Sequence, residues 1–230
     1  MVEFAYAVGR IRALEVHLLN ESQILRLVDA KDFEAAYLVL RENPTYEDTF
    51  DIERLLAADL SSTLALLRYL APDNPLLESL YRKYDPDMPL KKYLELLKET
   101  ARQHPLPLFA KYAQGFILLN ELKLELLMNG DFDPENILNR YRYTDYNRAV
   151  QAGLASYQKT GSLFGLEREI DNHLMSLLQR AKYQAFGIEP LLGFFFAKEI
   201  EHKILRLILT AKQMKVKTED IKERLRLPYV

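Results

Sequence analysis

Leucine dominates the apolar residues of this 230-residue chain, with 43 leucines against 11 isoleucines and 8 valines. A leucine side chain loses little rotamer freedom in a helix, whereas β-branched side chains lose more and favour strands. Apolar residues recur at steps of three and four almost throughout, and no stretch alternates long enough to predict a strand. We therefore expect an all-α protein of about ten to twelve helices.

Capping and breaking residues set the expected limits of these helices. Ser22, Asp32 and Thr218 are placed to cap the helices that follow them, and Pro134 suits a first helical turn. Residues suited to ending a helix are Asn43-Pro44, Asn129-Gly130 and Gly187. The helices are expected at residues 6–19, 23–30, 33–41, 51–70, 76–84, 90–102, 108–128, a short stretch after 133, 145–158, 163–186, 189–214 and from 218 onward.

The strongest helix breaker is His104-Pro105-Leu106-Pro107. It predicts two interleaved, similar helical lobes, residues 1–103 and 104–230. A weak repeat accompanies this division: Tyr6-Ala7-Val8-Gly9-Arg10-Ile11 matches Tyr112-Ala113-Gln114-Gly115-Phe116-Ile117, and Glu15 matches Glu121 at the same offset of 106 residues. Either the two lobes share a helix, or two leucine-rich helices resemble each other by chance.

Charge and composition exclude several classes of protein. The net charge of −2 and the sequence pI of about 6.1 give no bulk attraction to nucleic acid. The absence of cysteine excludes disulfides, thiol nucleophiles and cysteine-based metal sites. The longest apolar run is Pro190 to Ala197, far below the roughly 20 residues of a membrane span. We expect a protein without a signal peptide that reaches a membrane only through partners, and a buried Phe194-Phe195-Phe196; an exposed docking patch is the alternative for these rings.

No catalytic motif is recognisable in the chain. Phosphate loops, nucleophile elbows and dinucleotide fingerprints are absent, and the 8 glycines are not clustered. Glu199 and His202 have the Glu-x-x-His spacing of di-metal helical bundles, but the second pair fails because Glu169 and His173 are four residues apart. A metal-dependent helical-bundle enzyme is therefore kept only as a third hypothesis, and the sequence predicts no catalytic residue, metal ligand or cofactor.

The last helices are locally basic. Between Lys212 and Arg226 lie six Lys or Arg residues and three acidic residues. A helix-turn-helix reader of nucleic acid is one interpretation, but a net charge of three gives little phosphate contact. Basic residues in a last helical turn also stabilise the helix dipole. We therefore expect no nucleic-acid partner.

Several segments resemble one known family. They include Gly165-Leu166-Glu167-Arg168-Glu169-Ile170-Asp171, Ala197-Lys198-Glu199-Ile200-Glu201, Leu205-Arg206-Leu207-Ile208-Leu209 with Lys212, Ile221-Lys222-Glu223-Arg224-Leu225-Arg226, the opening helix with Asp29-Ala30-Lys31-Asp32-Phe33, and Leu119-Asn120-Glu121-Leu122-Lys123. The pattern is similar to the central-stalk linker of rotary A-type and V-type ATPases, which is the C subunit in archaea and bacteria and the d subunit in eukaryotes.

The chain also departs from this family's pattern. Members have three similar helical lobes and are longer, whereas this chain has room for about two. Ile204 stands where the family has asparagine, and Ile117 stands where it has an acidic residue. A shortened or divergent member is implied, with a shallow or incomplete central cavity.

The resemblance implies a mechanical role rather than chemistry. Such a protein sits on the proteolipid ring, receives the rotor shaft and passes torque between them, so it is cytoplasmic and peripheral to the membrane. Polar residues of the long helices then contact the shaft, and the hypothesised set is Arg10, Arg12, Glu199, His202 and Arg206. The competing interpretations are ordinary solvated charges at these positions, and a soluble helical adaptor or regulator of another complex.

Overall fold

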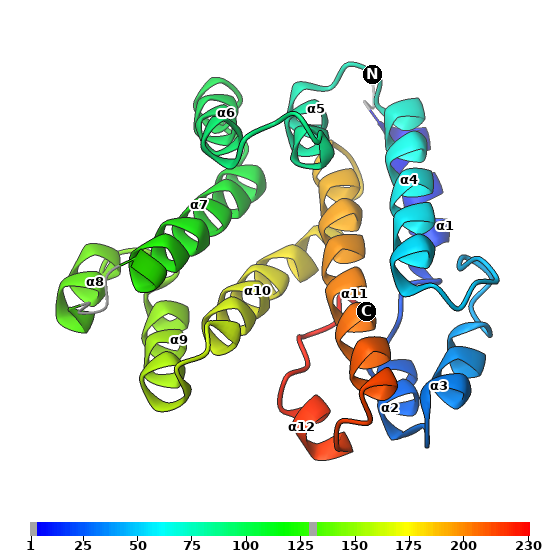
Figure 1. Ribbon diagram of the computed structural model, residues 1–230. Coiled ribbons are helices and arrows are strands. Elements are labelled where there is room, and N and C mark those ends of the chain that lie inside the picture. The colour runs from blue at the N-terminus through cyan, green and yellow to red at the C-terminus, as the bar shows by residue number, and fades with distance from the viewer. Residues whose placement is uncertain (1–3, 129–132) are drawn as a thin grey trace. The chain divides into compact units, whose positions relative to one another are not determined.

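The computed structural model describes residues 4–128 and 133–230 (Figure 1). Every regular element in these residues is a helix, with twelve α-helices and two short 3₁₀ helices, so the predicted all-α fold is confirmed. Helices dominate because leucine-rich segments bury one face while caps satisfy their ends.

Contacts group the chain into two compact units. The first unit joins Met1–Leu77 to Leu178–Val230, and the second unit is Glu78–Leu177. The predicted lobe boundary at residues 103/104 falls inside the second unit, between two of its helices. The lobes 1–103 and 104–230 therefore stay a prediction.

In the first unit, one long central helix is covered by its neighbours. Helix α11 packs against α1, α3, α4, α12 and the 3₁₀ helix η2, while α2 packs against α3 and α12. Because neighbours surround it, α11 is buried along most of its length, which makes it the core of this unit. The elements are α1 (Ala5–Glu15), α2 (Glu21–Asp29), α3 (Phe33–Leu40), α4 (Ile52–Leu70), η2 (Gln179–Tyr183), α11 (Glu189–Gln213) and α12 (Thr218–Lys222).

The second unit is built around an apolar cluster. Leu118, Leu122 and Leu126 of α7 pack there with Tyr146 and with apolar residues of α8, α9 and α10. Its elements are η1 (Arg82–Tyr84), α6 (Leu90–Gln103), α7 (Pro107–Met128), α8 (Pro134–Tyr141), α9 (Asn147–Thr160) and α10 (Phe164–Leu178); α5 (Pro75–Tyr81) crosses the boundary between the units.

Two of the predicted caps are wrong. Asn20 rather than Ser22 caps α2, because its side chain accepts from the Gln23 N–H at 2.9 Å while the Gln23 side chain accepts from the Asn20 N–H at 3.0 Å. This reciprocal pair satisfies two donors, which a serine two residues later cannot do. Thr218 is the first residue of α12, after Lys217. The predicted cap at Asp32 is confirmed.

One helix end also differs from the prediction. The helix expected to run to Gly187 ends as α10 at Leu178 and continues only as the short η2. The guanidinium of Arg12 binds the carbonyl oxygens of Ala181 in η2 and of Gln184 directly after it, which fixes this segment. The predicted stop at Asn129-Gly130 lies outside the described residues.

The phenylalanine run of α11 is buried as predicted. Phe194, Phe195 and Phe196 are 3%, 0% and 1% exposed, so they form core and not a docking patch. Among the described helices, none combines the length and the apolar character needed to span a bilayer.

Candidate partner-contact site on helices α1 and α11

The middle of α11 carries charged residues inside the core. Lys198, Glu199, Glu201 and His202 are each less than a tenth exposed. The other buried positions of this helix are apolar except Lys212 near its end, and a buried charge is costly unless it is paired. The structure pairs three of them with residues that lie far away in the sequence.

Lys198 forms ion pairs with two carboxylates, Asp59 of α4 and Glu201 of its own helix. The Lys198 ammonium lies 3.1 Å from Asp59 Oδ2 and 2.9 Å from Glu201 Oε1. His202 Nε2 lies 2.6 Å from the same Asp59 Oδ2. Glu201 also accepts from the Tyr46 hydroxyl at 2.6 Å. These five residues are called the α11 polar cluster below.

The cluster also fixes the segment after α1. Glu201 Oε2 accepts from the backbone N–H of Leu19 at 2.5 Å. One carboxylate therefore binds a lysine, a tyrosine and a main-chain amide, and holds the α1–α2 connection against α11. A carboxylate with so many donors is well satisfied, so the cluster is a structural joint.

The charges of the cluster keep Asp59 and Lys198 ionised. Burial alone would raise the pKa of Asp59, but the hydrogen bond with His202 and the charge of Lys198 outweigh it and hold that pKa below its ordinary value. Burial alone would lower the pKa of Lys198, but Glu201 and Asp59 outweigh it and raise that pKa. Burial, together with Glu201 and Asp59, raises the pKa of Tyr46 well above its usual value. None of these three groups is poised to exchange protons near neutral pH.

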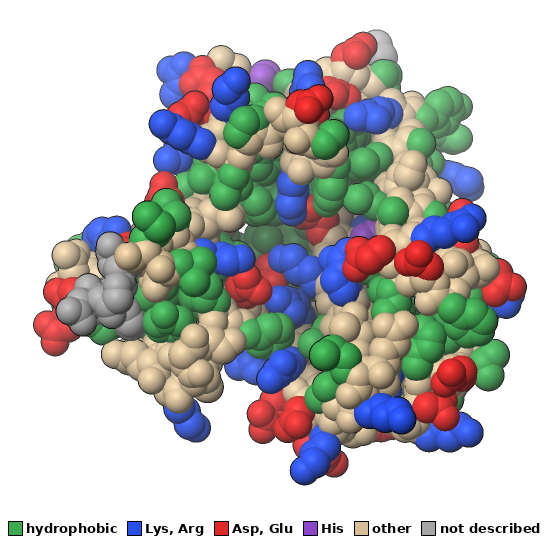
Figure 2. Space-filling view, in the orientation of Figure 1, with side chains coloured by type: hydrophobic (Ala, Val, Ile, Leu, Met, Phe, Trp, Pro, Cys, Tyr) green, Lys and Arg blue, Asp and Glu red, His purple; other side chains and the backbone are tan. Residues whose placement is uncertain are grey.

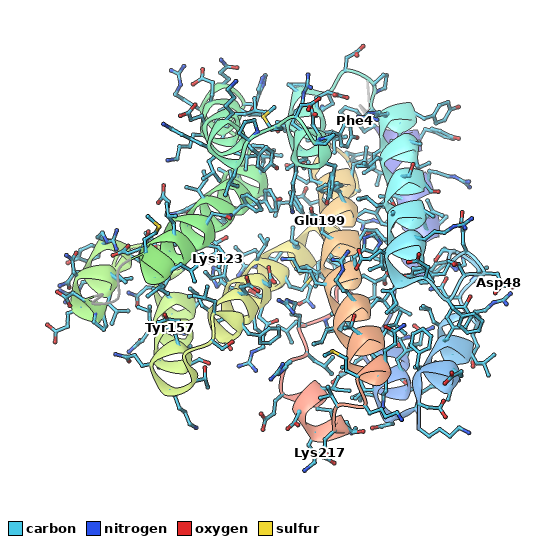
Figure 3. All side chains as sticks on the ribbon, viewed as in Figure 1. Phe4, Asp48, Lys123, Tyr157, Glu199 and Lys217 are labelled. Atoms are coloured by element: carbon cyan, nitrogen blue, oxygen red, sulfur yellow. The ribbon has the colours of Figure 1, made fainter. Side chains whose placement is uncertain are left out.

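Glu199 and His202, two of the hypothesised shaft contacts, are buried at 9% and 8% exposure. Glu199 projects from the middle of α11 in Figure 3. The Glu-x-x-His spacing does not build a metal centre, since His202 meets Asp59 and the described residues hold no group of three potential metal ligands. Both residues are too enclosed to offer a partner much surface.

Two of the three predicted arginines are engaged within the chain. Arg206 is half exposed and donates from Nε and Nη2 to the two carboxylate oxygens of Glu53 at 2.7 and 2.8 Å. Arg12 donates from Nη1 to both carboxylate oxygens of Glu15 at 2.7 Å, and from Nη2 to the two carbonyls at the end of η2. These bonds give each arginine an internal role.

A second polar group surrounds Glu15. The Tyr229 hydroxyl donates to Glu15 Oε1 at 3.2 Å, and the Lys182 ammonium lies 4.7 Å from the centre of the Tyr229 ring. Burial, together with the charge of Glu15, raises the pKa of Tyr229. The segment at Tyr229 is thereby held to α1.

Arg10 is the hypothesised residue that stays exposed on α1. The same helix exposes Tyr6 at 71%, Val16 directly after its end is 75% exposed, and a Cβ added at Gly9 would meet nothing within 4 Å. Residues 6, 9, 10, 13 and 16 recur at helical steps and are all exposed. This row is called the outer face of α1 below. Of the five predicted contacts, Arg10 is thus the one placed on an open surface with apolar neighbours.

Sequence reasoning missed Asp59, Tyr46 and the roles of Lys198 and Glu201. One signal was available for Asp59: it is an acidic residue at a buried position of α4, in step with Leu55, Leu56 and Thr63. Lys198 and Glu201 lie in the segment that carried the family resemblance. Their spacing of three residues places them on one helix face, but no local pattern shows which distant residues they meet.

Comparison with known proteins bears on these segments. A family model described as ATP synthase (C/AC39) subunit matches residues 7–89 and 90–224. The C subunit of the A-type ATP synthase of Methanosphaera stadtmanae is 24% identical over 239 residues, covering 99% of this chain and 58% of that protein.

Shorter matches have higher identity. The C subunit of the V-type sodium ATPase of Enterococcus hirae is 40% identical over 86 residues, 37% of this chain and 26% of that protein. The C subunit of the A-type ATP synthase of Methanothermobacter thermautotrophicus is 31% identical over 96 residues, 41% of this chain and 25% of that protein. The match to the Methanosphaera stadtmanae protein uses almost all of this chain but little more than half of that protein's length. Because the family model covers nearly the whole chain, the chain belongs to the ATP synthase (C/AC39) subunit family.

Proposed function

We propose that this chain is a central-stalk protein that couples the rotor shaft to the membrane proteolipid ring of an A-type or V-type ATPase. The observation that carries the proposal is the family match over residues 7–89 and 90–224. In this role the chain itself makes and breaks no bond, and it is peripheral to the membrane on the cytoplasmic side. Its partners are the shaft subunits and the ring.

The polar side chains in the core of the first unit support a mechanical role. The α11 polar cluster is enclosed, and its charges bind one another rather than a substrate. The contacts of Asp59 with Lys198 and His202 fix α4 against α11, and the Leu19 N–H bond to Glu201 fixes the α1–α2 connection there. A protein that transmits torque needs such rigid joints, because a loose helix bundle would absorb the motion.

On one face of the chain the surface charges are mixed rather than gathered by sign. On the face drawn in Figure 2, Lys and Arg side chains alternate with Asp and Glu side chains, with apolar patches between them. This distribution suits protein partners better than a polyanion. The outer face of α1 is our first choice for a shaft contact, because Arg10, Tyr6 and Val16 are open there.

A binding titration tests the proposal. The purified chain is mixed with the matching shaft subunits, and separately with the detergent-solubilised proteolipid ring, and the complexes are resolved by gel filtration at low and moderate salt. We expect a stoichiometric complex that Arg10→Glu weakens. If neither mixture gives a complex at micromolar concentrations, the rotor assignment fails and a helical adaptor of another assembly replaces it.

A matched variant separates a contact from a fold defect. Arg206→Glu breaks the pair with Glu53, and the double change Glu53→Arg with Arg206→Glu restores it in reverse. If Arg206 serves only inside the chain, the double variant binds the shaft subunits like the unaltered protein. If Arg206 also touches the shaft, binding stays weak in the double variant although the internal pair is restored.

A further inference from the structure

A groove lies at the end of α11 in the first unit. One wall is the connection from α2 to α3, from Asp29 to Glu34, and the other wall is the turn from α11 to α12, from Lys212 to Thr218. It encloses about 590 Å³, which is enough for a few side chains of a partner segment but not for a packed helix. The second wall is part of the basic stretch that the proposed function leaves unexplained.

Lys212 is the buried cation of this groove. It is 8% exposed, and its ammonium donates to the carbonyl oxygen of Ala30 at 2.5 Å. That bond satisfies the end of α2. Among the described residues no carboxylate forms an ion pair with Lys212, although buried ammonium groups are normally paired with one. The site therefore holds a positive charge without its counter-charge.

Two further lysines line the same wall. Lys215 and Lys217 are exposed, and no described carboxylate pairs with either of them. Lys215 has a φ of 55°, in the left-handed region that glycine or asparagine fills at lower cost. Lys217, labelled in Figure 3, stands at the start of α12. A lysine is thus present at a turn position where its backbone conformation is unfavourable.

The opposite wall limits which anion fits. Asp29 pairs with Lys222 at 2.8 Å, and Asp32 caps α3 by accepting from the Ala35 N–H. Glu34 is exposed in the first turn of α3. Lys31 also lines this wall and lies 3.6 Å from Asp32, so Glu34 is the acidic side chain of this wall without a described ion-pair partner. A nucleic acid or an anionic membrane would bring several charges near Glu34, which repels them. A single carboxylate avoids this repulsion.

The groove also offers apolar surface beside the lysines. Phe33 and Val216 line it, and both are half buried. We propose that this groove binds an extended segment of a protein partner in which one Asp or Glu lies between apolar residues. The carboxylate meets Lys212, Lys215 and Lys217, and the apolar neighbours pack on Phe33 and Val216. The inference does not depend on the rotor assignment.

Methyl NMR tests this proposal with a defined probe. The chain is labelled at its 8 valines, so that the Val216 methyl groups report on the groove. The probes are acetyl-Leu-Asp-Leu-amide, the corresponding Asn peptide and inorganic phosphate. We expect saturable Val216 shifts with the Asp peptide at millimolar concentrations, about tenfold weaker binding for the Asn peptide, and no comparable response to phosphate.

Variants locate the binding. Lys215→Asn with Lys217→Ser removes two exposed charges and relieves the turn, so it keeps the fold and is expected to abolish the Val216 response. Lys91→Ser with Lys92→Ser, two exposed positions on α6, is the matched control and leaves it unchanged. Equal shifts with the Asp and Asn peptides, binding of phosphate as strong as that of the peptide, or no shift at all would each overturn the proposal.

Discussion

Helices α1 and α7 carry the same short sequence pattern and use it differently. The second position of the pattern is an alanine and the sixth an isoleucine in both helices. These residues, Ala7, Ile11, Ala113 and Ile117, are all buried. The first position is Tyr6, which is 71% exposed, in one helix and Tyr112, which is 3% exposed, in the other. The shared pattern thus predicts which face of each helix is buried, whereas the exposure of the opposite face depends on the neighbouring elements.

The two glycines show the contrast most sharply. A Cβ at Gly115 would lie 2.4 Å from the hydroxyl oxygen of Tyr146, whereas a Cβ at Gly9 would meet nothing within 4 Å. In α7, glycine allows a buried aromatic ring to lie directly on the backbone. In α1 the equivalent space is open, which is why the outer face of α1 is available to a partner.

The means of attachment differ as well. Helix α7 is held by Leu118, Leu122 and Leu126 in an apolar cluster. Helix α1 is held in addition by polar groups: Arg12 binds the carbonyl oxygens of Ala181 and Gln184, and the Leu19 N–H that follows the helix binds Glu201. Helix α7 also forms ion pairs, among them Lys123–Glu167, but their side chains are partly exposed, and exposed pairs contribute less to stability than buried polar groups. Breaking polar contacts should therefore loosen α1 more than α7.

The largest expected effect comes from breaking the polar attachment of α1. Glu201→Ala removes the acceptor of Tyr46, Leu19 and Lys198 and leaves the ammonium with Asp59 alone. We expect a loss of about 3–5 kcal/mol in the free energy of unfolding, measured by urea denaturation followed by circular dichroism. Glu201→Gln keeps an oxygen acceptor without the charge and is expected to lose less.

An exposed ion pair of α7 serves as the control. Glu121→Ala removes a contact with Lys98 in which both side chains are at least half exposed, so the expected loss is below about 1 kcal/mol. Equal losses for Glu201→Ala and Glu121→Ala would show that the polar cluster does not anchor α1.

The second prediction concerns Gly115 of α7, where the ring of Tyr146 occupies the space that a Cβ would need. Gly115→Ala forces Tyr146 to move, although its ring is fully buried and its hydroxyl donates to the Lys111 carbonyl at 2.8 Å. Overpacking and loss of this bond should lower the free energy of unfolding by about 2–4 kcal/mol. In a Tyr146→Leu background, Gly115→Ala should lower the free energy of unfolding only slightly. A double-mutant cycle measures how much the effect of Gly115→Ala depends on Tyr146. Additive effects would contradict the close contact.

The third prediction uses pH to separate the two kinds of attachment. The pKa of Asp59 is lowered in the folded chain, so its contribution to stability is present above its unfolded pKa, about 3.9, and is lost as the pH falls through the folded value. The pKa of Lys198 is raised, so its contribution is present below about 10.4 and is lost as the pH rises through the folded value.

Urea midpoints measured at pH 7 and pH 3 test the acid side. The difference between them should be smaller in Asp59→Asn than in the unaltered chain, because the variant has no carboxylate to protonate at that position. Glu121→Gln, on the exposed face of α7, should keep the full difference. The same pH response in Asp59→Asn and in the unaltered chain would remove Asp59 from the explanation.

The sequence predicted what depends on local pattern. Leucine spacing predicted an all-α fold and the order of its helices, and the cap at Asp32 and the buried Phe194–Phe196 run followed from residue type. The cap of α2 was misplaced because Ser22 and Asn20 are both good caps, and only the reciprocal bond with Gln23 distinguishes them.

What the sequence did not predict is contact between distant residues. His202 was considered with Glu199, its neighbour on the helix, but it binds Asp59, which lies 143 residues away. Arg12 was hypothesised to contact the shaft, with a solvated surface charge as the alternative, but it binds the carbonyl oxygens of Ala181 in η2 and of Gln184 directly after it, which no side-chain pattern reveals. Helical periodicity shows which face of a helix is buried, and gives no information on which distant segment covers it.

The smallest effect is expected at the open glycine of α1. Gly9→Ala places a methyl group in empty space and removes the backbone entropy that glycine loses in a helix. We expect the free energy of unfolding to rise by about 0.5–1 kcal/mol. The same substitution at Gly115 has the opposite sign, so the pair forms a direct test of the comparison between α1 and α7.

Binding shows whether the glycine at that position serves a partner. If a shaft protein packs closely on the outer face of α1, Gly9→Leu should weaken the complex in gel filtration while the chain stays folded. Lys159→Leu, at an exposed position on α9, is the matched control and should leave the complex intact. A destabilised Gly9→Ala would mean that this space is filled within the chain, and α1 would then lose its distinction from α7.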